Sequence, residues 1–251
     1  MIMVLMLMLP IPSHADVTDG LVGWWKFDEG SGTSAADSSG QGNTGTLTLG
    51  PTWVAGKRGQ AVRFDGSDDY VSVPNGGGLN NVSTGSIAMW VKWTGTQDQG
   101  YANYGAVLAR QNNGQFSSTI IDLTTSNPDT AKVTWKFNSS GGFDIVGATS
   151  PLSGRWRHIV IAFTSGDHKM YMDGVLDGSS TTAGTSINNS GIPLTIGAWI
   201  GDGVSYSTSD IDDVRVYNRV LSPQDVYAIY SAATSRFRSN GQARFSNFVM
   251  N

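Results

Sequence analysis

The carboxylates are the residues of this chain whose chemistry would matter most, and their types and spacing argue against acid-base catalysis. Of the 20 acidic residues only Glu29 is a glutamate, and it stands in a glycine-rich stretch. Retaining glycoside hydrolysis needs two carboxyl groups about 5 Å apart. Asp212 and Asp213 are adjacent on a predicted strand, so period-two alternation places their side chains on opposite faces. The carboxylates therefore do not predict a catalytic pair.

The other groups that carry enzymatic chemistry are scarce. There are three histidines and no cysteine. His14 falls in an apolar leader, His158 in a predicted strand and His168 beside a predicted turn, and no phosphate loop or nucleophile elbow is present. We therefore expect a protein that is not an enzyme.

Sugar binding is the chemistry that the side chains favour, because it needs flat aromatic faces and hydrogen-bonding groups rather than nucleophiles. Trp24 or Trp25, Trp90, Trp135 and Trp156 lie in strong strand patterns and are expected in the core. The predicted ligand-binding residues flank glycine-rich loops or end a strand: Trp93, Tyr101, Tyr104, Arg110, Trp199 and Tyr206, with Asn112 and Asn113 as further polar contacts. Aromatic residues in loops can equally plug the ends of a sandwich.

Composition points to the same class of ligand. The 251 residues include 16 basic and 20 acidic side chains, a net charge of −4, and only 14% of residues are charged, against about a quarter in ordinary domains. Nucleic acid is therefore not an expected partner. Glycine, serine, threonine and asparagine replace the charges, and 8 Trp and 8 Tyr accompany them. This mixture is typical of secreted β-proteins that contact polar, uncharged ligands.

The two ends of the chain have compositions of their own. Residues 1–15 contain an apolar run, too short to span a bilayer, followed by Pro10, Pro12, Ser13 and Ala15. This predicts a signal peptide and a secreted, extracellular protein; since no Lys or Arg precedes the run, an uncleaved N-terminal segment is the alternative. Residues 235–251 form a polar tail with Arg-Phe pairs at 236–237 and 244–245. The tail is either disordered or an arm that docks on a partner.

Between these ends, residues 16–234 show the pattern of a single all-β domain. More than ten short apolar stretches recur at roughly ten-residue spacing and are bounded by Gly, Asn and Asp. A helix is expected after Ser222, which is a good N-cap, with Pro223 at its first position and Asp225 near the positive end of its dipole. The pattern predicts an antiparallel two-sheet sandwich with one short C-terminal helix.

Six short motifs resemble the successive signatures of laminin-G-like, concanavalin A-like jelly-roll domains of secreted bacterial proteins. They are Trp-Lys-Phe-Asp-Glu-Gly-Ser-Gly at 25–32, Asp-Ser-Ser-Gly-Gln-Gly-Asn at 37–43, Gly-Gln-Ala-Val-Arg-Phe-Asp-Gly at 59–66 with Asp-Tyr-Val at 69–71, Trp-Arg-His at 156–158, Tyr-Met-Asp-Gly at 171–174 and Ile-Asp-Asp-Val-Arg-Val-Tyr at 211–217. The resemblance implies the fold. It says less about function, because this fold serves lectins, glycan-binding modules and adhesion domains and, in some branches, glycoside hydrolases or polysaccharide lyases. These two enzyme classes are the enzymatic alternatives that the resemblance implies.

The resemblance also implies a structural calcium ion. In related jelly-rolls an aspartate just before the last strand helps to hold the ion, and the matching residue is Asp212. Its expected neighbours are Asp28 and the turn at Asp65 and Gly66; the alternative is that these carboxylates only cap turns. We therefore expect a lectin-like, calcium-supported module that binds a glycan or glycoconjugate. The alternative is a structural or adhesive protein that binds proteins or assembles with its own copies.

Overall fold

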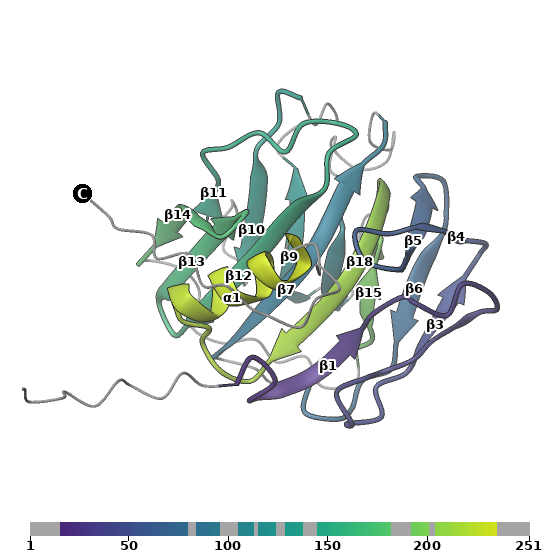
Figure 1. The fold of residues 1–251 in the computed structure, drawn as a ribbon, viewed down its shortest axis with the longest axis horizontal. Helices are drawn as coiled ribbons and strands as arrows, with labels where there is room; N and C mark the ends of the chain where they lie inside the picture. The colour runs from purple at the N-terminus through teal and green to yellow at the C-terminus, as the bar shows by residue number, and fades with distance from the viewer. Residues whose placement is uncertain are drawn as a thin grey trace, which may run out of the picture.

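The computed structural model describes residues 16–79, 84–95, 105–112, 115–123, 129–137, 145–181, 192–200 and 204–234, which form a two-sheet antiparallel jelly-roll sandwich with one helix (Figure 1). Sheet A has the order β14 (Val175–Ser180), β13 (Asp167–Met172), β12 (Arg157–Thr164), β7 (Gly85–Trp93), β18 (Thr208–Tyr217), β5 (Gln60–Asp65), β4 (Thr52–Ala55), and β1 (Leu21–Trp25) also pairs with β18.

Sheet B packs against sheet A. Its order is β11 (Ile145–Val146), β10 (Val133–Phe137), β9 (Gln115–Leu123), β8 (Leu108–Asn112), β15 (Leu194–Ile196), β6 (Tyr70–Val73), β3 (Gly45–Thr48), β2 (Ser34–Ala35). A short hairpin of β16 (Ala198–Ile200) and β17 (Val204–Tyr206) carries the chain from sheet B into β18. The predicted sandwich is therefore confirmed.

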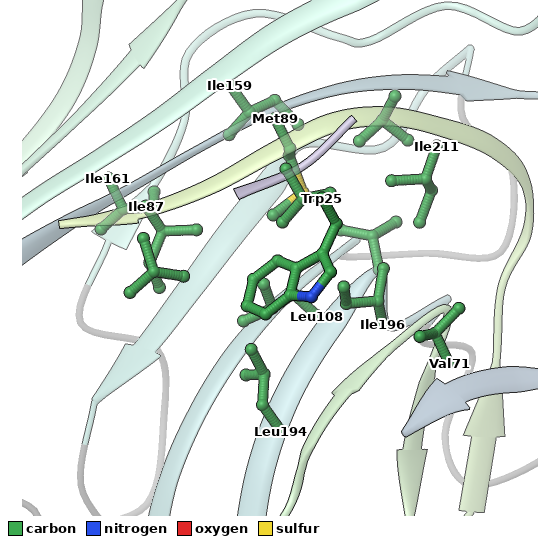
Figure 2. Close-up of a cluster of buried hydrophobic side chains, with 14 of the residues drawn as sticks. Trp25, Val71, Ile87, Met89, Leu108, Ile159, Ile161, Leu194, Ile196 and Ile211 are labelled. Carbon is green, nitrogen blue, oxygen red and sulfur yellow. The ribbon is translucent and has the colours of Figure 1, made fainter. Parts of the chain in front are cut away.

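The main core lies between the two sheets and follows the alternation of each strand. Trp25 is fully buried there, among Ile87 and Met89 of sheet A and Leu108 and Ile196 of sheet B (Figure 2). Neighbouring Trp24 points the other way, because successive side chains on a strand alternate. One tryptophan of the pair thus fills the core and the other faces outward.

The helix α1 (Pro223–Thr234) covers part of the outer face of sheet A (Figure 1). Val226 and Ile229 of the helix pack on Ala88, Val160 and other outward residues of the sheet, so β7 and β12 are buried on both faces. The predicted cap is present: the N–H of Asp225 donates to Ser222 Oγ at 3.2 Å, and Asp225 Oδ2 accepts from the N–H of Ser222 at 2.9 Å.

The sequence pattern predicts one strand over 193–199, but the structure divides it at Gly197. This glycine has φ +88°, and a Cβ at its position would lie 2.4 Å from the ring of Phe64. Only glycine fits such a position. The break turns β16 away from β15 and creates the β16–β17 hairpin.

Within the described ranges, α1 is too short and too polar to cross a membrane, and no other helix there could do so.

Candidate functional site

The central strand β18 has an interrupted edge, and this interruption creates the candidate site. β5 pairs with the first half of β18, ending at Ile211 opposite Val62. β1 pairs with the second half, beginning at Val214 opposite Trp25. Asp212 and Asp213 lie between these two pairings, so neither β5 nor β1 pairs with the backbone of β18 at these two residues.

A β-bulge lies at the same place. The register of β18 against β7 shifts between Asp212 and Arg215, and Asp213 has φ 52°. Aspartate tolerates this left-handed conformation better than most residues. The extra residue of a bulge reverses the face of the sheet to which each following side chain of the strand points.

The bulge overturns the predicted arrangement of the two aspartates. Ile211 and Val214 both point into the core, and the two residues between them, Asp212 and Asp213, both line one pocket on the outer side of sheet A. The expectation that they face opposite sides is therefore wrong. The same shift places Arg215 on the outer face, away from Ile211, although strict alternation predicts that they share a face.

The pocket is small and strongly charged. Its volume of about 250 Å³ equals that of roughly eight water molecules at ~30 Å³ each. It is lined by Trp24, Lys26, Asp28, Arg58, Asp212, Asp213 and Arg215. Two strands and two connecting segments thus contribute one indole ring, three cations and three carboxylates.

One wall of the pocket is formed by side chains that contact Asp213. Arg215 donates to both carboxylate oxygens, at 3.1 Å and 2.9 Å, and Trp24 Nε1 donates to Oδ1 at 2.6 Å. The Arg215 guanidinium also lies 4.6 Å from the centre of the Trp24 ring, and Lys26 Nζ lies 4.2 Å from it. The charge of Asp213 is therefore already compensated within the protein.

The opposite wall is the turn between β4 and β5, held by two carboxylates from distant parts of the chain. The N–H of Arg58 donates to Asp212 Oδ2 at 2.9 Å, and the N–H of Gln60 donates to Asp28 Oδ1 at 3.0 Å. Gly59 between them has φ +54°, and a Cβ there would lie 2.0 Å from Asp28 Oδ1. The turn reaches these carboxylates because residue 59 has no side chain.

Asp212 is the least satisfied group of the pocket. It is fully buried, and its Oδ1 has no hydrogen-bond partner among the described residues. Burial, with the nearby negative charges of Asp213 and Asp28, raises the pKa of Asp212 to about 7, although the N–H of Arg58 opposes the shift. A buried carboxyl with a free oxygen is a position at which a proton or a cation is stabilising.

A row of buried polar rings continues from Asp212 across sheet A. Asp212 is paired with Trp90 of β7, and Trp90 is paired with His158 of β12. Tyr230 of α1 stacks on Trp90 with ring centres 5.7 Å apart. Burial lowers the pKa of His158 to about 3, with the charge of Arg215 adding to it and that of Asp213 opposing it. His158 is therefore a neutral, structural histidine at ordinary pH.

The predicted aromatic ligand residues are not gathered in one place. Trp93 is wrong as a surface platform: it is fully buried in the core, because it shares the inward face of β7 with Ile87, Met89 and Val91. Tyr101 and Tyr104 lie outside the described residues.

Arg110 is also wrong as a surface contact. Only 4% of it is exposed, and its Nη1 donates to the carbonyl oxygen of Leu79. Burial lowers the pKa of Arg110 to about 10. Position 110 faces inward two residues after Leu108, as the period of the strand requires.

Trp199 and Tyr206 lie on the β16–β17 hairpin, and both are partly exposed. Trp199 is paired with Ser205, whereas Tyr206 is paired with Ala198, so the two rings leave opposite faces of the ribbon. The two predicted ligand-binding residues therefore do not converge in one groove. Trp199 packs on Ala106 and Ala109, and its indole N–H has no acceptor among the described residues.

The four predicted metal ligands fall in two separate places. Asp28 and Asp212 share the pocket, but Asp65 and Gly66 lie at the far end of β5, where Asp65 is paired with Thr208. There Asp65 Oδ1 accepts the N–H of Ser67 at 2.8 Å, which is the turn-capping role. A single site made by all four residues is therefore wrong, and no group of three or more His, Cys, Asp or Glu suited to a metal occurs in the described ranges.

Solved structures that resemble this chain share its fold at low sequence identity. Domain 4 of AbnA, a GH43 extracellular arabinanase from Geobacillus stearothermophilus in complex with arabinotriose, has a TM-score of 0.64 and 20% identity, over 84% of this chain and 98% of that one. The binding domain of Paraclostridial Mosquitocidal Protein 1 has a TM-score of 0.67 and 16% identity, over 86% and 53%.

A structure of botulinum neurotoxin type C, whose cell entry depends on interaction with two ganglioside molecules, has a TM-score of 0.63 and 13% identity, over 87% of this chain and 53% of that one. The chain thus spans about half the length of the toxin structures that it matches. No curated protein matches the chain. The laminin G family described as the concanavalin A-like lectin/glucanases superfamily matches residues 65–227, well over half of the sequence. This chain therefore belongs to the concanavalin A-like lectin/glucanases superfamily.

Proposed function

We propose that this chain is a secreted, non-catalytic carbohydrate-binding module that carries a structural calcium ion. The observation that carries the proposal is the pocket beside β18, in which an indole ring stands among hydrogen-bonding side chains on the rigid outer face of a sheet. Ligand sites are typically concave and combine aromatic surface with a few polar groups. The fold supports it as well, because the arabinanase domain is a complex with arabinotriose and the neurotoxin depends on gangliosides.

The residues of the pocket fit a calcium ion at Asp28 and Asp212. Asp212 Oδ1 is buried without a partner, and each carboxylate uses one oxygen for a backbone N–H of the turn at 58–60. One oxygen of each thus remains for a hard cation, which prefers carboxylate and carbonyl oxygens. When bound, the ion would neutralise two neighbouring carboxylates and join the N-terminal segment to β18.

Chelation tests the metal directly. At a free calcium concentration 100 times Kd the folded state gains about 2.7 kcal/mol, which EDTA removes. Asp28→Asn and Asp212→Asn should abolish this gain. Asp65→Asn is the matched control, since Asp65 caps a turn outside the pocket. A melting temperature of the wild type that does not respond to EDTA would contradict the calcium site.

A glycan array tests the binding function. The wild type should bind a defined set of glycans in calcium, and Asp212→Asn should lose that binding. The same glycans are then incubated with the protein and assayed for released reducing ends. Cleavage would replace the proposal with an enzyme, which matters here because Asp212 and Asp213 line one pocket. An array without any bound glycan would reject the binding function.

A second function, protein binding or self-assembly, is favoured by an exposed apolar area near the start of β14. Three apolar side chains are largely exposed there: Val175 (70%), Leu176 (52%) and Tyr227 (62%). The turn at Gly174 lies beside the Tyr227 ring, since a Cβ built on Gly174 would lie 3.4 Å from that ring. Light scattering of the wild type and of Leu176→Asp tests self-assembly. A monomer in both cases would contradict self-assembly through this area.

A further inference from the structure

Some charged side chains of the pocket form an ion pair with each other and others do not. The charges outside that pair indicate which class of sugar the pocket would bind. Asp213 and Arg215 form a buried ion pair, in which Arg215 Nη2 lies 2.9 Å from Asp213 Oδ2. Within the described ranges, neither Lys26 nor Arg58 forms a salt bridge. Two cations and two carboxylates, Asp28 and Asp212, therefore remain in a pocket of about 250 Å³.

We propose that the pocket binds an acidic sugar residue whose anionic group is held by Lys26 and Arg58, once a divalent cation has neutralised Asp28 and Asp212. The inference rests on the proposed function and specifies its ligand. It goes beyond a general lectin role, because it assigns the anion-binding side chains and makes the metal a condition for binding.

Both cations are placed to receive a ligand. Lys26 Nζ lies 4.2 Å from the centre of the Trp24 ring, which orients the ammonium group at the pocket. Arg58 is anchored by its own backbone N–H, which donates to Asp212 Oδ2 at 2.9 Å, so its guanidinium extends from a fixed point. A guanidinium binds a carboxylate or sulfate through two parallel hydrogen bonds, and an ammonium adds a point charge.

The role of the cation follows from the charge balance. Without it, Asp28 and, where it is ionised, Asp212 offset the charges of Lys26 and Arg58, and Asp28 repels an incoming anion. With a divalent ion on the two carboxylates, the pocket carries the two uncompensated positive charges of Lys26 and Arg58. Bound cations invert the local electrostatics in this way. Neutral sugars would not sense the change.

The contacts around Trp24 favour a charged ligand over a stacked neutral one. The ring is held by Arg215 and Lys26, 4.6 Å and 4.2 Å from its centre, and by its hydrogen bond to Asp213. Charged groups therefore already occupy part of the aromatic surface that a neutral pyranose ring would use.

Calorimetric titration with three trisaccharides tests the inference: trigalacturonate, its fully methyl-esterified form, and a sulfated galactose trisaccharide. Each is measured in calcium and in EDTA, with the wild type, Lys26→Gln and Arg58→Gln. Lys169→Gln is the control, because Lys169 is a surface lysine paired with Asp167 on β13. In calcium, at least one acid should bind the wild type at least about tenfold more tightly than the ester. The comparison of carboxylate with sulfate identifies the acid.

The variants decide whether the pocket is responsible. Lys26→Gln and Arg58→Gln should each remove about tenfold in affinity for the acid, whereas Lys169→Gln should not, and EDTA should weaken acid binding to the level of the ester. Equal affinity for acid and ester would overturn the inference and leave glycan binding intact. Acid binding that both variants and EDTA leave unchanged would also overturn it. If none of the three sugars binds, the inference fails, and the array then decides the proposed function separately.

Discussion

The indole N–H of Trp24 donates a 2.6 Å hydrogen bond to Asp213 Oδ1, across 189 residues of sequence. The bond joins the outward side of β1 to the bulge of β18. Arg215 donates two further hydrogen bonds to the same carboxylate. One wall of the pocket thus also fastens the start of the domain to its last strand. Changes at the site should therefore affect stability as well as binding.

Replacing Asp213 with asparagine should be strongly destabilising. Asparagine retains the left-handed conformation and an acceptor for Trp24, but it removes the carboxylate charge that compensates the buried charge of Arg215. Removing one member of a buried pair costs about 3–5 kcal/mol, or roughly 6–20 °C in Tm for a domain of this size. Thermal unfolding by circular dichroism measures it.

Asp167→Asn is the control for that prediction. Asp167 pairs with Lys169 on the surface, where the two side chains are 47% and 42% exposed. Such pairs contribute about 0–1 kcal/mol. Equal losses in the two variants would contradict the structural role assigned to Asp213.

Replacing Gly59 with alanine should cost more than the same change at Gly32. Both residues have positive φ, +54° and +80°, which costs about 1–2 kcal/mol for a side-chain-bearing residue. Nothing lies within 4 Å of a Cβ at Gly32, whereas a Cβ at Gly59 would meet Asp28. Urea unfolding of both variants should show the larger loss at position 59, and calorimetry should show weaker calcium binding only there.

Asp212 should make the calcium-free protein less stable as the pH rises. Its folded pKa of about 7 lies above the unfolded value near 3.8, so the folded state holds the extra proton between these values. The unfolding free energy of the wild type, relative to Asp212→Asn, should therefore fall by about 1.4 kcal/mol per pH unit between pH 4.5 and 6.5. A difference that does not vary with pH in urea titrations would contradict the buried state of this carboxyl.

His158 should have the opposite effect in an overlapping range. Its folded pKa of about 3 lies below the unfolded value near 6.5, so the unfolded state binds the extra proton and stability is lost as the pH falls from 6.5 toward 3. Relative to His158→Gln, the wild type should lose about 1.4 kcal/mol per pH unit on acidification from pH 6 to 4. A chemical shift titration that places the imidazole pKa near 6.5 would refute this.

The sandwich could be predicted from the sequence because most strands keep a strict period of two. Ile87, Met89 and Val91 share one face of β7, and the cap at Ser222 is a local signal that needs no tertiary context. The same rule places Trp93 and Arg110 inward. The prediction that these two residues belong to a binding surface was wrong, because the buried region continues as far as the ends of the strands.

The pocket could not be predicted, because it depends on a bulge. A signal for it is nevertheless present: the apolar residues of β18 are at 211, 214 and 216, and no uniform period of two puts Ile211 on the same face as Val214. One extra residue must lie between them. Lys26 and Arg58, by contrast, have no signature of their own, since the hydrogen bonds that bring their segments to β18 span 189 and 154 residues.

The pairing of β1 with β18 also constrains how the domain is made. About 190 residues separate the two strands, and at roughly 5–20 residues per second a ribosome needs some 10–40 s to produce the second after the first. Throughout that time the Trp24–Trp25 segment exists without the strand that covers it. We expect the nascent chain, rather than the finished sandwich, to be the form that depends most on holding chaperones.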